Sequence, residues 1–165
     1  MNSQSSNLNE EEIGKYILDA AFKVHTALGP GLLESVYEAA LAMELTKQGL
    51  EVERQKPISV TYEGLPIDVA FRADLIVNRL VLVELKSVEA IVPLFRKITT
   101  NYLKLIPLRL GYLINFNETH LKNGLTRLTN GLEGKTFFPP RPNLSEVDLQ
   151  KPSSSSPPSR SSRDI

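Results

Sequence analysis

The run Leu80-Val81-Leu82-Val83 constrains the fold more than any other segment of this 165-residue chain. Alternate side chains of a β-strand point to opposite faces, so a strand that is apolar at successive positions is covered on both sides. We therefore expect a central strand in a β-sheet that carries helices on both faces, which is an α/β architecture. The run continues into Glu84-Leu85-Lys86, where charged residues return at a spacing of two.

Helical patterns precede this strand. Apolar residues recur at three- and four-residue steps over residues 13–28, behind the acidic first turn Glu10-Glu11-Glu12. This helix must end at Gly29-Pro30-Gly31, because proline disfavours α geometry in the residue before it and the glycines add flexibility. A second helix is predicted over residues 32–48, with Gly49 ending it.

β patterns surround the central run. Pro57 is expected to separate two short strands, and Asn78-Arg79 marks a turn just before the central strand. Pro93 is well placed to open a helix that reaches Leu105. The expected strands cover residues 51–55, 58–62, 67–77, 80–86 and 108–116. The predicted order is two helices, a β-meander, a helix and a strand.

Composition divides the chain into one domain and two polar ends. Residues 139–165 contain eight Ser and six Pro with almost no large apolar side chains, so they cannot bury enough surface to offset their ordering entropy. We expect a disordered N-terminal segment at residues 1–10, a folded domain at residues 11–134 and a disordered Ser/Pro-rich tail at residues 135–165.

Cysteine content and hydropathy exclude several classes of protein. The chain has no Cys and two His, which excludes disulfides, thiolate catalysis and cysteine-ligated zinc, so a bound metal would have oxygen ligands. No apolar stretch approaches the ~18 to 20 residues of a membrane span, and the first residues lack the pattern of a signal peptide. We therefore expect a cytoplasmic protein that makes no membrane contact.

Charge is balanced over the chain but not along it. The 19 basic and 19 acidic residues cancel. Between Arg79 and Arg109, however, six basic residues stand against two acidic ones. This local excess is compatible with a phosphate-facing surface, and equally with an ordinary solvated helix face.

Three charged residues around the central strand could form a catalytic site. Glu84 and Lys86 share one face of the strand, whereas Leu85 points to the other. A three-residue connection before the strand, or a bulge, would put Asp74 opposite Glu84, whereas a strict two-residue connection would put it opposite Val83 and separate the carboxylates. Two convergent carboxylates would bind a hard cation, Mg²⁺ or Mn²⁺. The competing interpretation is that Glu84 and Lys86 are an exposed ion pair at a strand end.

These segments resemble the motifs of the PD-(D/E)XK nucleases. The resemblance is carried by Asp74 in Phe71-Arg72-Ala73-Asp74-Leu75-Ile76-Val77, followed by Val83-Glu84-Leu85-Lys86. Leu28-Gly29-Pro30-Gly31-Leu32-Leu33-Glu34-Ser35-Val36-Tyr37 is similar to the signature of the GxxExxY proteins, a branch of that superfamily, whose three named positions are matched by Gly31, Glu34 and Tyr37. It continues through Glu53-Arg54-Gln55 and Gly111-Tyr112-Leu113-Ile114-Asn115-Phe116. The resemblance implies a restriction-endonuclease-like core, a central mixed β-sheet flanked by helices.

The resemblance also implies roles for individual residues. Asp74 and Glu84 would ligate Mg²⁺ or Mn²⁺, and Lys86 would assist the attacking water. Glu34 would sit beside the metal carboxylates, although a glutamate in the first turn of a helix is also favoured by the helix dipole alone. Tyr37 would either hydrogen-bond to Glu34 or pack in the core.

One position departs from the pattern of these relatives. They usually carry Gln four residues before a Tyr, near the active site, in the helix that follows the E-x-K strand. Tyr102 matches that Tyr, but Ile98 stands where the Gln would be. If that Gln orients a catalytic group, Ile98 would lower activity without changing metal binding.

Two functions therefore compete. The carboxylates and Lys86 favour a Mg²⁺- or Mn²⁺-dependent nuclease that acts on DNA or RNA. Ile98 and the neutral net charge favour a catalytically inactive nuclease-fold module that binds nucleic acid or a protein partner, and a purely structural interaction domain is a third alternative. A small nuclease domain often needs a second copy to handle both strands, so a homodimer is the alternative to a monomer.

Overall fold

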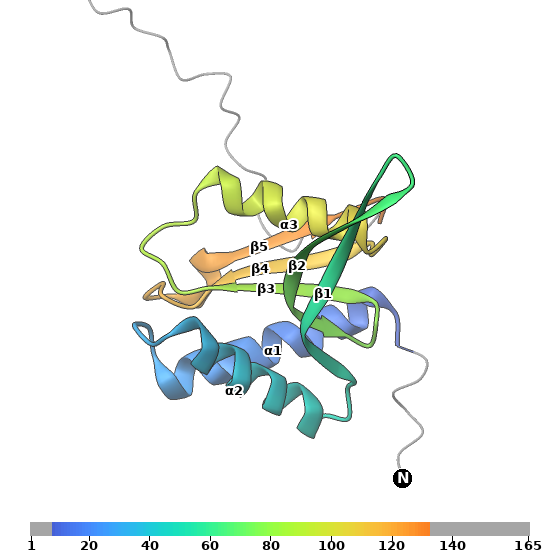
Figure 1. Ribbon diagram of the computed structural model, residues 1–165. Coiled ribbons are helices and arrows are strands. Elements are labelled where there is room, and N and C mark those ends of the chain that lie inside the picture. The colour runs from blue at the N-terminus through green and yellow to red at the C-terminus, as the bar shows by residue number, and fades with distance from the viewer. Residues whose placement is uncertain (1–7, 133–165) are drawn as a thin grey trace, which may run out of the picture.

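A five-stranded mixed sheet with helices on both faces makes up the part of the chain that the computed structural model describes, residues 8–132. Helices α1 (Glu10–Leu28) and α2 (Glu34–Lys47) cover one face. Helix α3 (Pro93–Leu105) covers the other face, so that the sheet is the middle of three layers (Figure 1). The α/β class and the mixed sheet flanked by helices are confirmed.

The strands lie in the order in which they occur along the chain. They are β1 (Val52–Tyr62), β2 (Leu65–Val77), β3 (Val81–Lys86), β4 (Leu110–Asn115) and β5 (Leu125–Thr129). β3 and β4 are parallel and are joined through α3, whereas the other neighbouring strands are antiparallel. β3 is third of five and is buried from Val81 to Leu85, so the expected central strand is confirmed.

Two expectations about the strands were wrong. Pro57 does not divide the first β segment, because β1 is an edge strand and has N–H groups with no neighbouring strand to bond. The second error is β5, which was not expected: it is a five-residue strand that pairs with β4 after the short 3₁₀ helix η2 (Leu121–Gly124). Its sequence, LTRLT, has two leucines separated by two polar residues and gives only a weak β signal.

The described domain begins earlier than expected. Asn9 caps α1 with a complete capping box, in which its side chain accepts from the Glu12 backbone N–H while the Glu12 carboxylate accepts from the Asn9 N–H. Leu8 packs against the core, so residues 8–10 belong to the domain rather than to the N-terminal segment. The remainder of that segment and the Ser/Pro-rich tail lie outside the described residues. No helix within residues 8–132 is long and apolar enough to cross a membrane.

Side chains of alternating parity along β2 and β3 face the two helical layers. From Leu75 to Val77 of β2 and along β3, the odd-numbered residues face α1 and α2 and the even-numbered ones face α3, whereas Ala73, earlier in β2, belongs to the cluster on the α3 side. The first cluster contains Leu75, Val77, Val81, Val83 and Leu85. The second contains Ile76 and Leu82 together with Leu103 of α3.

The break between α1 and α2 is fixed by Tyr37. Its hydroxyl donates to the Gly29 carbonyl at 2.6 Å and accepts from the Leu32 N–H at 3.1 Å. Its ring is fully buried and stacks on Phe116, with centroids 4.6 Å apart. Gly31 has φ of 94°, a left-handed conformation that favours glycine. These contacts set where α2 begins relative to the end of β3.

The β1–β2 hairpin is much longer than the strand beside it. β2 pairs with β3 only from Leu75 to Val77, and the rest of the hairpin extends beyond the sheet. Figure 1 shows its tip projecting past the C-terminal end of α3. One face of the hairpin therefore lies beside α3 rather than beside another strand.

We predict that Tyr37→Phe lowers the free energy of unfolding by about 0.5–1.5 kcal/mol, because the substitution removes two part-buried hydrogen bonds, to the Gly29 carbonyl and from the Leu32 N–H. Urea unfolding of the two proteins measures the difference. Tyr16→Phe is the matched control, since the Tyr16 side chain is 40% exposed. Equal loss in both variants would contradict this role of the Tyr37 hydroxyl.

Candidate active site

The connection between β2 and β3 sets which side chains meet. It consists of Asn78, Arg79 and Leu80, between the paired residues Val77 and Val81. The regular pairing ends at Leu75 opposite Val83, and just beyond it the Asp74 N–H donates to the Glu84 carboxylate. This is the three-residue alternative left open by the sequence, and it puts both carboxylates on the face of the sheet that carries α3.

Hydrogen bonds from the backbone hold the two carboxylates. The Asp74 N–H donates to Glu84 Oε1 at 3.2 Å, and the Leu85 N–H donates to Asp74 Oδ2 at 2.8 Å. Only 13% of the Asp74 side chain and 6% of the Glu84 side chain are exposed. Hydrogen bonds from backbone N–H groups to carboxylates therefore link β2 and β3 at the point where their regular pairing ends.

Lys86 brings a positive charge to this pair. Its Nζ lies 3.9 Å from Asp74 Oδ2 and 4.0 Å from Glu84 Oε2. It also donates to the Leu85 carbonyl at 2.5 Å and lies 5.8 Å from the centre of the Phe95 ring. The ammonium therefore faces both carboxylates from the C-terminal end of β3.

Glu34 approaches from the opposite layer. It is the first residue of α2, and its Oε1 lies 3.4 Å from Lys86 Nζ. The pKa of the Glu34 carboxyl is raised above its ordinary value. Partial burial is the largest cause, the positive charge of Lys86 acts against it, and the negative charge of Asp74 adds to it. Glu34 therefore joins the electrostatic environment of the site through Lys86, while 42% of its side chain stays exposed.

Glu84 is the most perturbed acid of the site. Burial, followed by the negative charge of Asp74, raises the pKa of its carboxyl to about 8. Lys86 and the Asp74 N–H act in the opposite direction but do not cancel this rise. At neutral pH the Glu84 side chain therefore holds a proton for much of the time, unless another positive charge comes close.

The two tyrosines singled out from the sequence occupy different places. Tyr37 uses its hydroxyl on the backbone of Gly29 and Leu32, as described above, rather than on Glu34. Tyr102 lies on α3, where burial and then the charges of Glu84 and Asp74 raise its pKa. Of these two tyrosines, Tyr102 is therefore the one whose pKa is affected by the carboxylates.

Sequence reasoning did not single out the residue that holds the other oxygen of Asp74. Gln55 Nε2 donates to Asp74 Oδ1 at 3.1 Å and to Glu38 Oε2 at 2.7 Å. Glu38 is only 6% exposed and also accepts from Arg54 Nε at 2.9 Å. Gln55 has φ of 49°, uncommon for a residue other than glycine. Only its place in Glu53-Arg54-Gln55, beside the recognised motifs, could have indicated it.

The family model of the PD-(D/E)XK nuclease superfamily matches residues 11–128. The chain belongs to this superfamily. Searches of curated proteins and of solved structures gave no match.

Nucleases of the PD-(D/E)XK superfamily generally use divalent metal ions, so the donors present here can be tested for fit. Among residues 8–132, no group of three or more Asp, Glu, His or Cys side chains is arranged to hold a metal ion. Asp74 and Glu84 form a pair, and Mg²⁺ is commonly held by one or two carboxylates while waters and substrate oxygens complete its shell. Burial and the charge of Asp74 raise the pKa of Glu84 even though Lys86 Nζ lies 4.0 Å away, so a cation bound at the pair would favour the anionic form. The pair fits a hydrated ion that substrate helps to hold.

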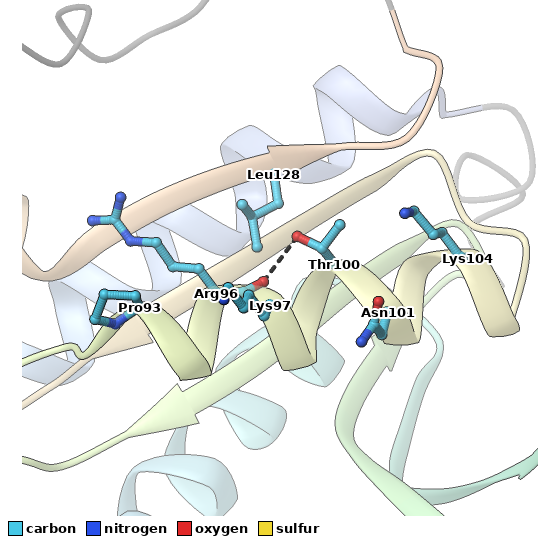
Figure 2. A pocket seen from close by; sticks show the side chains of 7 residues that line it. All are labelled: Pro93, Arg96, Lys97, Thr100, Asn101, Lys104 and Leu128. Carbon is cyan, nitrogen blue, oxygen red and sulfur yellow. Dashed lines mark hydrogen bonds between the residues drawn. The ribbon is translucent and has the colours of Figure 1, made fainter. Parts of the chain in front are cut away.

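Two clefts flank α3. The first, which we call the β5 groove, has a volume of ≈ 480 Å³. Figure 2 shows the side chains that line it: Pro93, Arg96, Lys97, Thr100, Asn101 and Lys104 of α3 and Leu128 of β5. Its charged lining residues are all basic, and α3 contains no acidic residue.

The second, which we call the hairpin cleft, lies between α3 and the β1–β2 hairpin and has a volume of ≈ 470 Å³. Its lining residues are Val60, Phe71, Ile98, Tyr102 and Leu105, together with the polar residues Asn101 and Lys104. Ile98, the departure noted in the sequence, is thus a half-buried part of this cleft beside Tyr102.

We predict that Glu84→Gln stabilises the protein at alkaline pH when metal is chelated. Because the folded-state pKa of about 8 exceeds the ordinary 4.5, the folded protein binds more protons between these pH values, and its free energy of unfolding falls as pH rises through them. The variant does not have this loss. The free energy of unfolding of the variant should exceed that of the wild type by on the order of a few kcal/mol at about pH 9. The difference should vanish near pH 4.5.

Urea unfolding at a series of pH values measures this difference. Glu89→Gln is the control, because Glu89 is exposed and forms no ion pair with a residue that the structure describes. A Glu84→Gln curve parallel to the wild-type curve would show that Glu84 does not titrate anomalously.

Proposed function

We propose that this protein is a metal-dependent nuclease that hydrolyses phosphodiester bonds of nucleic acid. The observation that carries the proposal is the convergence of Asp74 and Glu84 on one face of the sheet, with Lys86 Nζ within 4.0 Å of both carboxylates. A buried pair of acids with one shared cation is costly for folding, which is typical of a site kept for chemistry.

Each residue has a role that its contacts support. Asp74 and Glu84 would hold Mg²⁺ or Mn²⁺, which when bound supplies positive charge to the phosphate that is attacked. Gln55 and the Leu85 N–H fix the two oxygens of Asp74 and so keep its carboxylate directed to the site. Lys86 can donate a hydrogen bond to the attacking water or to a phosphate oxygen, and Glu34 holds its ammonium from the other side.

The basic surface of α3 supports nucleic acid as the substrate. Arg96, Lys97 and Lys104 line the β5 groove on the same helix that covers the carboxylates. Such cations neutralise the phosphate backbone and hold it without regard to sequence. The chain as a whole is neutral, so this local surface carries the electrostatic argument.

We also propose that the protein belongs to the GxxExxY branch of the superfamily. The proposal is supported by the structural setting of the three named positions. Gly31 takes a left-handed φ, Glu34 begins α2, and Tyr37 ties the preceding loop to the core. Together they direct the start of α2 toward Lys86, which is a physical reason to find these three residues together.

The alternative is an inactive nuclease-fold module that binds nucleic acid. Two observations favour it: within the described part of the chain, two carboxylates rather than three or more converge, and Ile98 puts an apolar side chain beside Tyr102 in the hairpin cleft. Metal binding and cleavage distinguish the two functions directly.

We predict that the wild type binds Mn²⁺ and cleaves DNA or RNA, and that Asp74→Asn loses both properties. Asparagine keeps the shape and an acceptor for the Leu85 N–H but removes the charge that the ion needs. Lys86→Gln should retain Mn²⁺ binding while cleavage falls by about 10²-fold or more. Isothermal titration calorimetry and a gel assay of cleavage measure the two properties.

Asp19→Asn is the control for loss of an exposed carboxylate, far from the site on α1. Wild-type protein that binds oligonucleotides but neither Mn²⁺ nor Mg²⁺, and cleaves nothing, would establish the inactive module instead.

We predict that Ile98→Gln raises the rate of cleavage, without a change in Mn²⁺ affinity, because it adds a polar group beside Tyr102 that can orient substrate or water. Ile98 is half-buried, so the cost in stability is moderate, and thermal unfolding should be measured in parallel. Ile98→Ala is the matched control for loss of the apolar side chain. If both substitutions have the same effect on the rate, the amide has no role.

A further inference from the structure

The hairpin cleft has an aromatic wall that is open to water. The rings of Phe71 and Tyr102 lie with centroids 5.7 Å apart at an angle of 50°. Phe71 is 43% exposed although it faces a concave surface. Val60, Ile98 and Leu105 add further apolar side chains to the lining. A cleft of this kind is the usual setting for a ligand that has a flat apolar face.

Two polar residues of the cleft have groups available for a ligand. Asn101 forms no hydrogen bond through its side chain with the residues described, and its amide can donate and accept at once. Lys104 is exposed and forms no ion pair within residues 8–132. The cleft therefore offers a stacking surface, an amide that matches the edge of a base, and a cation.

The hairpin cleft lies next to the carboxylates. Phe95, under Lys86, and Tyr102 are seven residues apart on α3 and so lie on one face, about 10 Å from each other along the axis. The charges of Glu84 and Asp74 act on the Tyr102 hydroxyl, which agrees with this proximity. A ligand stacked on Tyr102 would therefore lie next to a phosphate that Lys86 contacts.

We propose that the hairpin cleft binds an unpaired nucleobase of the substrate, which stacks on Phe71 and Tyr102 while the adjoining phosphates contact Lys104. Bases inside a duplex have their faces covered, so the site selects a single strand or an extrahelical nucleotide. Lys104 also lines the β5 groove, where Arg96 and Lys97 continue the basic surface along α3 (Figure 2). This charge matches a polyanion. The inference rests on the proposed nuclease function and narrows its substrate.

Binding of matched oligonucleotides with metal chelated tests the site without cleavage. The probes are a short single strand, a blunt duplex of the same sequence, and that duplex with one unpaired nucleotide, each as DNA and as RNA. Fluorescence anisotropy gives the affinities. A 2-aminopurine at the unpaired position reports stacking, and the chain has no Trp to obscure it.

The wild type is expected to bind the single strand and the bulged duplex more tightly than the blunt duplex, with quenched 2-aminopurine. Phe71→Ala should lower affinity for these two probes about 10-fold or more and relieve the quenching, while blunt-duplex affinity stays unchanged. Phe71→Trp should keep the preference. Tyr62→Ala is the matched control, since Tyr62 is an exposed aromatic residue of the same hairpin outside the cleft. Thermal unfolding of each variant excludes loss of the fold.

Equal affinity of the wild type for all three probes, or an equal effect of Phe71→Ala on all of them, would overturn the base site. The proposed nuclease would stand in that case if Asp74→Asn still abolished Mn²⁺ binding and cleavage. No binding of any oligonucleotide, with no cleavage, would overturn both proposals, and a preference for the blunt duplex would overturn the base site alone.

Discussion

The length of one turn determines the whole candidate site. Three residues join β2 to β3, so the register pairs Val77 with Val81 and Leu75 with Val83 and brings Asp74 beside Glu84. Asn78 and Arg79 take left-handed φ angles of 48° and 58°, and Asn78 is bonded through its backbone and its side chain to Glu51 before β1. A shift of one residue in either strand would direct its carboxylate into the apolar layer under α1 and α2. The hydrophobic pattern and the turn therefore enforce the same register.

The carboxylates are held mainly by uncharged donors. Asp74 accepts from a backbone N–H and from the Gln55 amide, and Glu84 accepts from a backbone N–H. Such donors orient the oxygens but supply no full positive charge, so burial, followed by the negative charge of Asp74, raises the pKa of Glu84. The left-handed Gln55 adds backbone strain at the same place. The large apolar core on the other face of the sheet supplies stability that offsets these local costs.

Local patterns predicted some elements well and could not predict others. The bounds of α3 follow from Pro93 and the helical period, and the covered nature of β3 follows from four successive apolar residues. Whether Asp74 lies opposite Glu84 could not be decided, because the sequence alone does not fix the number of residues in the turn between β2 and β3. Gln55 and Glu38 were missed, since a hydrogen bond across 17 residues depends on how α2 packs on β1. β5 was missed because its stability comes from pairing with β4 rather than from its own residues.

The layered arrangement separates two kinds of evolutionary change. The acids and Lys86 are anchored to strands whose register is enforced by the core, whereas Ile98, Asn101 and Lys104 project from a helix that lies over them. Substitutions in the clefts beside α3 leave the strand register unchanged. Proteins with this fold can therefore change the ligands that they bind while they keep the same carboxylates. Divergence among relatives should therefore accumulate on the outer surfaces of α3 and the hairpin before it reaches the strand ends.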